Sequence, residues 1–164
     1  MHRTRLLAIF GIVVGVVGLF LTSLNTDGEA TLPALNQANP DFPDGIPTIW
    51  GGLDGWAQIA LVALIVIVLA LALRPVVQES MHRTSGVILI VIGIALFAYA
   101  VVKWIDASDK ADTLQEAFAG AAGAGAIPVA FEVSTAPLGY VLLLAGTAVV
   151  AVAGLLAVRG ADKG

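Results

Sequence analysis

The chain contains no cysteine, and only 12% of its 164 residues are charged. A small scaffold held together by disulfides is therefore excluded. Soluble globular domains have a charged fraction of about 25%, so a chain with 59% hydrophobic residues does not belong to that class. Only eight Lys and Arg residues are present, and most of them flank apolar segments, so we expect no nucleic-acid partner. The class that remains is an integral membrane protein.

Long apolar runs are what the sequence has instead. Four runs carry no Asp, Glu, Lys, Arg or His, and each approaches the ~20 residues that a helix needs to cross a bilayer. The sequence predicts an all-α integral membrane protein with four transmembrane helices, at about 6–25, 56–73, 86–102 and 138–158. The first run follows Arg3 and Arg5 as a secretory signal would. It is longer than the apolar core of such signals and no A-x-A site closes it, so we interpret it as a retained helix.

The basic residues that flank these runs predict the orientation, because Lys and Arg are retained on the cytoplasmic side during insertion. Lys103 and Lys110 fall on one side, and the other basic residues fall on the opposite side: Arg3, Arg5, Arg74, Arg83, Arg159 and Lys163. Both termini are therefore predicted to be cytoplasmic. We expect a multi-pass protein of a plasma membrane, bacterial in view of its bias toward Ala, Val, Gly and Asp.

The connections between the predicted spans differ in length. Residues 74–85 form a short cytoplasmic turn, whereas residues 26–55 and 103–137 form two long outer loops that together make a small cap. The first outer loop contains four prolines among Asn and Asp residues, so we interpret it as ordered but irregular rather than helical. Loops of this length without regular structure are uncommon unless they have a function.

The second outer loop contains two patterns of regular structure. Ala111, Leu114 and Phe118 follow helical spacing and predict a short separate helix, lying on the membrane surface or against the other loop. Alternating apolar and polar residues at 129–134 predict a short strand. Residues 48–50 are its predicted partner in a small β-hairpin.

An internal echo suggests a duplication. The tetrapeptide Met-His-Arg-Thr occurs at residues 1–4 and again at 81–84, each time before an odd-numbered span. Two copies of a unit of helix, outer loop and helix would cover residues 1–80 and 81–164. The competing interpretation is that any segment entering a bilayer from the cytoplasm favours a basic start, and little identity follows the tetrapeptide.

Gly11, Gly15 and Gly18 lie near one face of the first predicted span, and the first two form a G-x-x-x-G motif. Membrane helices associate where glycine allows their backbones to approach closely, so this face is predicted to contact another helix. The neighbour is either a span of the same chain, which we favour, or a different protein. Outer aromatic residues are further candidates for contact with a partner: Trp50, Trp56, Trp104 and Phe131.

Side chains for catalysis or cofactor binding are missing at membrane depth. His2 and His82 are the only histidines, and both lie at cytoplasmic helix starts, where they cannot hold a haem between helices. Ion-coupled transport relies on an ionisable residue within the membrane, and the four runs contain none. Lys103 and Asp106, at the outer end of the third run, are interpreted as a snorkelling lysine with a surface partner. We therefore expect no catalytic, cofactor-binding or metal-binding residues.

By elimination, the leading hypothesis is a non-catalytic accessory or stabilising subunit of a larger membrane assembly, such as a transporter or a respiratory complex. Its expected partners are membrane lipids and other integral membrane subunits. One alternative is a passive channel or a module that handles a lipid or small molecule, which requires a cavity at the helix junctions. Another alternative is a sensor whose outer cap binds a ligand.

Overall fold

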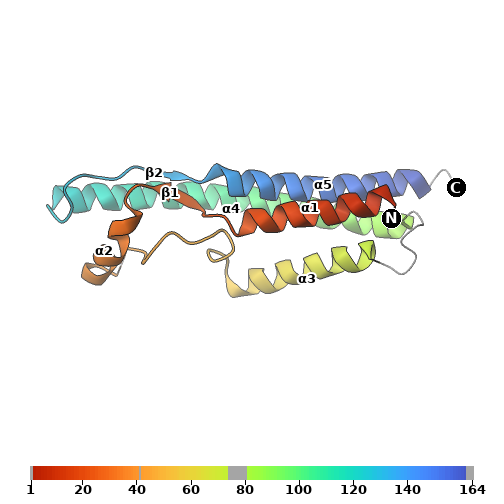
Figure 1. Cartoon of the computed structure of the whole chain (residues 1–164), viewed down its shortest axis with the longest axis horizontal. Coiled ribbons are helices and arrows are strands. Elements are labelled where there is room, and N and C mark those ends of the chain that lie inside the picture. Colours follow the sequence, from red (N-terminus) through yellow and green to blue (C-terminus); the bar gives the residue numbers. More distant parts are fainter. Residues whose placement is uncertain (1, 41, 74–80, 162–164) are drawn as a thin grey trace.

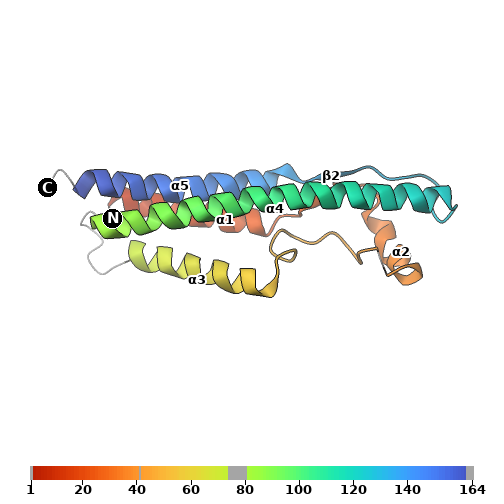
Figure 2. The same cartoon turned by 180° about the vertical axis from the view of Figure 1, so that it is seen from behind.

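The computed structural model describes residues 2–40, 42–73 and 81–161, and within them the chain is mostly helical. The predicted cytoplasmic turn lies largely outside the described residues, as does Met1 of the repeated tetrapeptide. In chain order the elements are α1 (Arg3–Leu19), β1 (Leu24–Thr26), the 3-10 helix η1 (Glu29–Thr31), α2 (Leu32–Ala38), α3 (Gly55–Ala72), α4 (Arg83–Gly123), β2 (Val133–Thr135) and α5 (Pro137–Ala161). Figure 1 shows α1, α4 and α5 side by side, with α3 set apart from them, and the view from behind agrees (Figure 2).

Three helices are long and apolar enough to cross a membrane: α3, α4 and residues Pro137–Gly160 of α5. The chain is therefore a multi-pass membrane protein. The first predicted span, 6–25, is longer than the helix found there: α1 has only 17 residues and ends at Leu19. Thr22 and Ser23 follow, and the hydroxyl of Ser23 donates to the carbonyl of Pro47, 2.9 Å away. At the end of α1 the backbone pairs with the first outer loop instead of continuing the helix, because the carbonyls of Leu19 and Leu21 accept from the amides of Trp50 and Ile49.

The segment that follows the third predicted span differs most from its predicted structure. Residues 103–123 were predicted to leave the membrane as a loop with a separate short helix, but they continue α4 as one helix of 41 residues. Ala111, Leu114 and Phe118 are buried, as their spacing predicted. Between Lys103 and Ala119 the sequence has neither Pro nor Gly and contains four Ala residues, so nothing breaks the helix where the apolar run ends.

A two-stranded antiparallel sheet lies beside this outer part of α4. β1 pairs with β2, with Leu24 opposite Thr135 and Thr26 opposite Val133. The predicted pairing with residues 48–50 is therefore wrong: Thr48 instead forms an isolated bridge with Thr22. The physical reason is the packing of α5 along α1, which brings the residues after α1 next to the residues before α5.

The first outer loop is less irregular than predicted, because it contains η1 and α2. Pro33 lies in the first turn of α2, where the missing amide hydrogen costs no helical bond. Leu32 of α2 is fully buried, and the side chain of Asn36 donates to the carbonyl of Phe42. The fully buried ring of Phe118 on α4 lies 6.1 Å from the ring of Phe42. We call η1, α2, the sheet and residues 42–53 the cap, and it packs on the outer part of α4.

α3 is hydrogen-bonded to the rest of the chain near both of its ends. At its last turn, the guanidinium Nη1 of Arg5 donates to the carbonyls of Leu71 (3.3 Å) and Ala72 (3.0 Å). At its first turn, the side chain of Gln58 donates to the carbonyl of Trp50, 3.1 Å away. The last carbonyls of a helix lack intrahelical partners and carry partial negative charge, so a cation there stabilises the helix end.

Replacing Arg5 with methionine is expected to lower the free energy of unfolding by about 1.5–3 kcal/mol, since it removes charged hydrogen bonds to carbonyls that are buried with it. Arg5 is only 4% exposed. The effect is measured as the melting temperature of the purified chain in detergent. Arg3→Met is the matched control, because it removes the same charge from an exposed position two residues earlier. Equal losses for both variants would show that the bonds to α3 are not the cause.

Candidate functional site

A cavity lies between the cap and the outer part of α4, and its volume is about 360 Å³. We call it the outer cavity. Apolar walls come from Leu24, Ile49 and Leu53, and Tyr140 lines the side formed by the first turn of α5. Its charged and polar groups come mostly from one helix: Lys103, Asp106, Lys110 and Thr113 of α4. A volume of this size and a mostly apolar wall with a few polar groups are typical of small-molecule sites.

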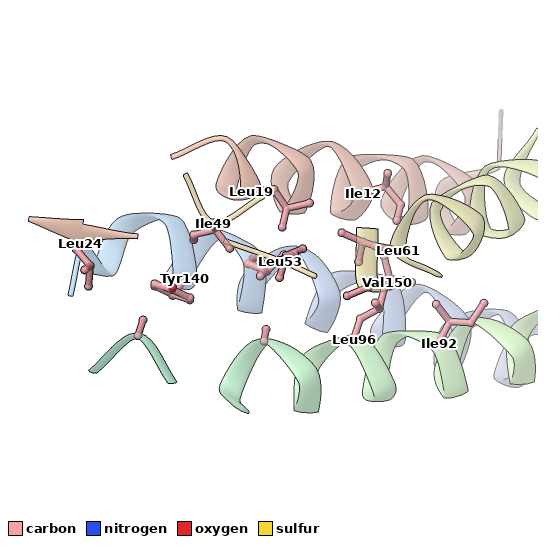
Figure 3. Packing of buried hydrophobic residues seen from close by; sticks show 14 of the residues in the cluster. Ile12, Leu19, Leu24, Ile49, Leu53, Leu61, Ile92, Leu96, Tyr140 and Val150 are labelled. Atoms are coloured by element: carbon pink, nitrogen blue, oxygen red, sulfur yellow. The ribbon is translucent and has the colours of Figure 1, made fainter. Parts of the chain in front are cut away.

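A narrow apolar crevice continues from this cavity between α1, α3, α4 and α5. Ile49, Leu53 and Lys103 line both spaces, so the two are adjoining. The crevice has a free volume of only about 30 Å³, which is about the space of one water molecule. Figure 3 shows Leu53 with Leu61 of α3, Leu96 of α4 and Val150 of α5 in the space between these helices.

Two of the three predicted glycines of α1 are packed tightly against α5, and the third faces open space in the crevice. A Cβ built on Gly11 would lie 2.7 Å from the carbonyl oxygen of Gly146, and one on Gly18 would lie 2.6 Å from the carbonyl oxygen of Gly139. Both glycines therefore contact α5 within the same chain. A Cβ on Gly15 would meet nothing closer than 3.8 Å, at Leu143, and Gly15 lines the crevice.

The aromatic candidates are not gathered at one place. Trp104 stacks on Tyr140 with a ring separation of 5.7 Å, next to the outer cavity. Trp50 lies 6.4 Å from the ring of Phe20 at the end of α1. The other two are also separated: Phe131 packs edge-on against Phe118 in the cap, and Trp56 is 68% exposed at the start of α3. Of the predicted residues, only Gly11, Gly15 and Trp104 lie at the crevice or beside the outer cavity.

The polar groups of the site form a short ladder on α4. Lys103 Nζ lies 2.9 Å from Asp106 Oδ2, the pairing expected from the sequence, and 5.8 Å from the centre of the Tyr99 ring. The hydroxyl of Tyr99 is buried and has no hydrogen-bond partner among the described residues. Buried hydroxyls are nearly always hydrogen-bonded, so this donor has capacity for an acceptor from outside the chain.

The position of Tyr99 and Lys110 at the site was not predicted from the sequence, although the spacing of these residues is informative. Tyr99, Lys103, Asp106, Lys110 and Thr113 are three or four residues apart in turn, which places them along one face of a helix. That signal was hidden because residues 103–137 were interpreted as a loop.

No protein-family model matches the chain, and neither a curated protein nor a solved structure is significantly similar to it.

Proposed function

We propose that the chain is a non-catalytic four-span module of a plasma membrane, with both termini in the cytoplasm, that binds an amphiphilic molecule in the outer cavity. α1 is shorter than the three candidate spans, but it packs along α5 beside them, which supports counting it as a span. The N- and C-terminal ends lie at the same end of the molecule (Figure 1). Every arginine that the described residues contain lies toward that end, in agreement with a cytoplasmic position.

The observation that carries this proposal is the outer cavity adjoining an apolar crevice at the level where the apolar run of α4 ends. A polar group fits the cavity, because Lys103, Lys110 and Thr113 offer donors there. An apolar chain leaving the cavity meets the walls of the crevice.

The test is saturable binding of an amphiphile to the purified chain. Replacing Trp50 and Trp56 with phenylalanine leaves Trp104 as the single tryptophan, beside the cavity wall. A phosphatidylglycerol with brominated acyl chains, titrated in detergent, is expected to quench this fluorescence with saturation. Gly52→Leu fills the outer cavity and is expected to weaken binding about tenfold, a loss of about 1.4 kcal/mol.

The control is Gly45→Leu, the same substitution in the same loop. A Cβ added at Gly45 would meet no atom within 4 Å. A Cβ on Gly52 would meet only backbone oxygens 3.6 and 3.7 Å away, so neither variant is expected to distort the backbone. Linear, unsaturable quenching, or equal affinities for the two variants, would contradict the proposal.

A second candidate function is the accessory subunit, which one feature favours independently. The outer part of α4 carries Asp109, Asp112 and Glu116 on its exposed surface, beyond the apolar run. Twenty helical residues extend about 30 Å, so this acidic surface is presented well outside the hydrocarbon core. A membrane partner with a basic outer domain would be recovered with the chain in mild detergent and lost after charge reversal of these three residues.

A further inference from the structure

The outer side of the chain is acidic, yet its basic residues meet at one place. Between Arg83 and Arg159 the sequence contains only two Lys or Arg residues, Lys103 and Lys110. Both line the outer cavity, whereas Asp106 is the only acidic residue among the side chains that line it. The distribution of charge therefore makes the cavity the most basic site on the outer side of the described residues.

The charges within the cavity are not balanced. Asp106 is paired with Lys103 at 2.9 Å, and Asp54 also interacts electrostatically with Lys103 from the start of α3. Lys110, one to two turns farther along α4, is exposed and lines the same cavity. The lining side chains alone carry one more positive charge than negative, and Asp54, outside the lining, offsets this excess. The preference for an anion therefore rests on the donors of the lining, which outnumber its acceptors.

Donors also extend toward the crevice. The Tyr99 hydroxyl lies one turn of α4 below Lys103 and is buried without a hydrogen-bond partner among the described residues. A group with several acceptor oxygens and a negative charge matches this set of donors. The cavity also stands at the end of the apolar run, beside the stacked rings of Trp104 and Tyr140, at the depth typical of lipid headgroups.

We propose that the outer cavity binds the phosphate headgroup of an anionic phospholipid, whose oxygens accept from Lys103 and Lys110 while the first carbons of an acyl chain lie at the mouth of the crevice. This inference rests on the proposed binding of an amphiphile and specifies its headgroup. Asp106 opposes the bound anion and competes for Lys103, so it limits the affinity. The lipid rather than a free phosphate is the occupant, because the apolar crevice adjoins the cavity.

The experiment compares lipids with identical acyl chains in the Trp104 quenching assay. Phosphatidylglycerol is expected to bind at least about tenfold more tightly than diacylglycerol, which lacks the phosphate. Zwitterionic phosphatidylcholine is expected to lie between them. Equal binding of all three would overturn the headgroup assignment while leaving amphiphile binding intact, whereas no saturable binding of any lipid would overturn both. Displacement of the lipid by inorganic phosphate at equal concentration would show that the ligand is a soluble phosphate and would also overturn the inference.

The charge variants provide readouts of opposite sign. Lys110→Gln is expected to weaken phosphatidylglycerol binding about tenfold, and Asp106→Asn to strengthen it about fivefold, the size expected from one interaction of ~1 kcal/mol between solvated charges. Lys110→Arg is expected to restore binding. Arg159→Gln, which removes an exposed cation from the far end of α5, is the matched control.

Two outcomes of the variant series contradict the inference. If Asp106→Asn weakens binding, then Asp106 supports the site structurally and does not oppose an anion. If Arg159→Gln weakens binding as much as Lys110→Gln, then lipid is attracted by overall charge and not by the outer cavity. Diacylglycerol affinity is expected to stay unchanged in every charge variant, which separates headgroup recognition from a general loss of folding.

Discussion

Replacing Gly146 of α5 with alanine is expected to lower the free energy of unfolding by about 3 kcal/mol, the upper part of the range for an overpacked interior. The new Cβ would lie 2.5 Å from the carbonyl oxygen of Gly11 and 2.5 Å from the amide nitrogen of Gly15. Both atoms belong to the α1 backbone, so no side chain can rotate away and the two helices must separate. The measurement is the melting temperature of the purified chain, together with the amount of folded protein recovered from membranes.

Gly15→Ala is the control on the facing helix. Its Cβ would come no closer than 3.8 Å to Leu143. Alanine is a better helix former than glycine by about 1 kcal/mol, so this variant is expected to be neutral or more stable. The contrast between the two variants is the prediction. If Gly146→Ala leaves stability unchanged and instead releases a co-purifying protein, then the glycine face belongs to an interface with another chain.

Replacing Phe118 with alanine is expected to release the cap from α4 at a cost of about 3–5 kcal/mol, as is typical of a fully buried phenylalanine. The ring of Phe118 is completely buried. Its centre lies 6.1 Å from the ring of Phe42 in the cap and 5.4 Å from the ring of Phe131, which precedes β2. Amide hydrogen exchange is expected to accelerate in β1, β2 and α2, while the inner halves of α4 and α5 stay protected.

The matched control for this variant is Phe97→Ala on the same helix. Phe97 is 41% exposed within the apolar run, so its removal deletes far fewer contacts within the chain than removal of the fully buried Phe118. Its effect on exchange in the cap is expected to be negligible. Uniform loss of protection along all helices in Phe118→Ala would mean that the cap and the bundle unfold together, contrary to the prediction.

The sequence located the three helices that are apolar enough to span a membrane, because their apolar runs end at charged residues, whereas the first predicted span, 6–25, extends past the end of α1 at Leu19. α3 and α5 begin and end within a few residues of the predicted spans. The same signal could not locate the end of α4, since an apolar run marks where hydrocarbon ends and not where a helix ends. Residues 103–123 are more polar than the apolar run, but they contain six alanines and no proline, and their helical spacing was interpreted as a separate element.

The site and the sheet were harder to predict for a different reason. β1 and β2 are more than a hundred residues apart, and what joins them is the close packing of α1 and α5 at their glycines. The individual strands carry little information about that contact. The outer cavity is a volume between elements, so no residue pattern encodes it directly. The helical spacing of Lys103 and Lys110 was visible, but its meaning depended on α4 continuing past the apolar run.

The uninterrupted course of α4 has a mechanical consequence. A helix of 41 residues is about 60 Å long, and its middle contains no hinge such as proline. Tilting a helix of that length by about 10° around its N-terminal end moves its C-terminal end through about 10 Å. The cap packs on the outer part of α4, so a tilt of α4 at its N-terminal end is expected to move the cap.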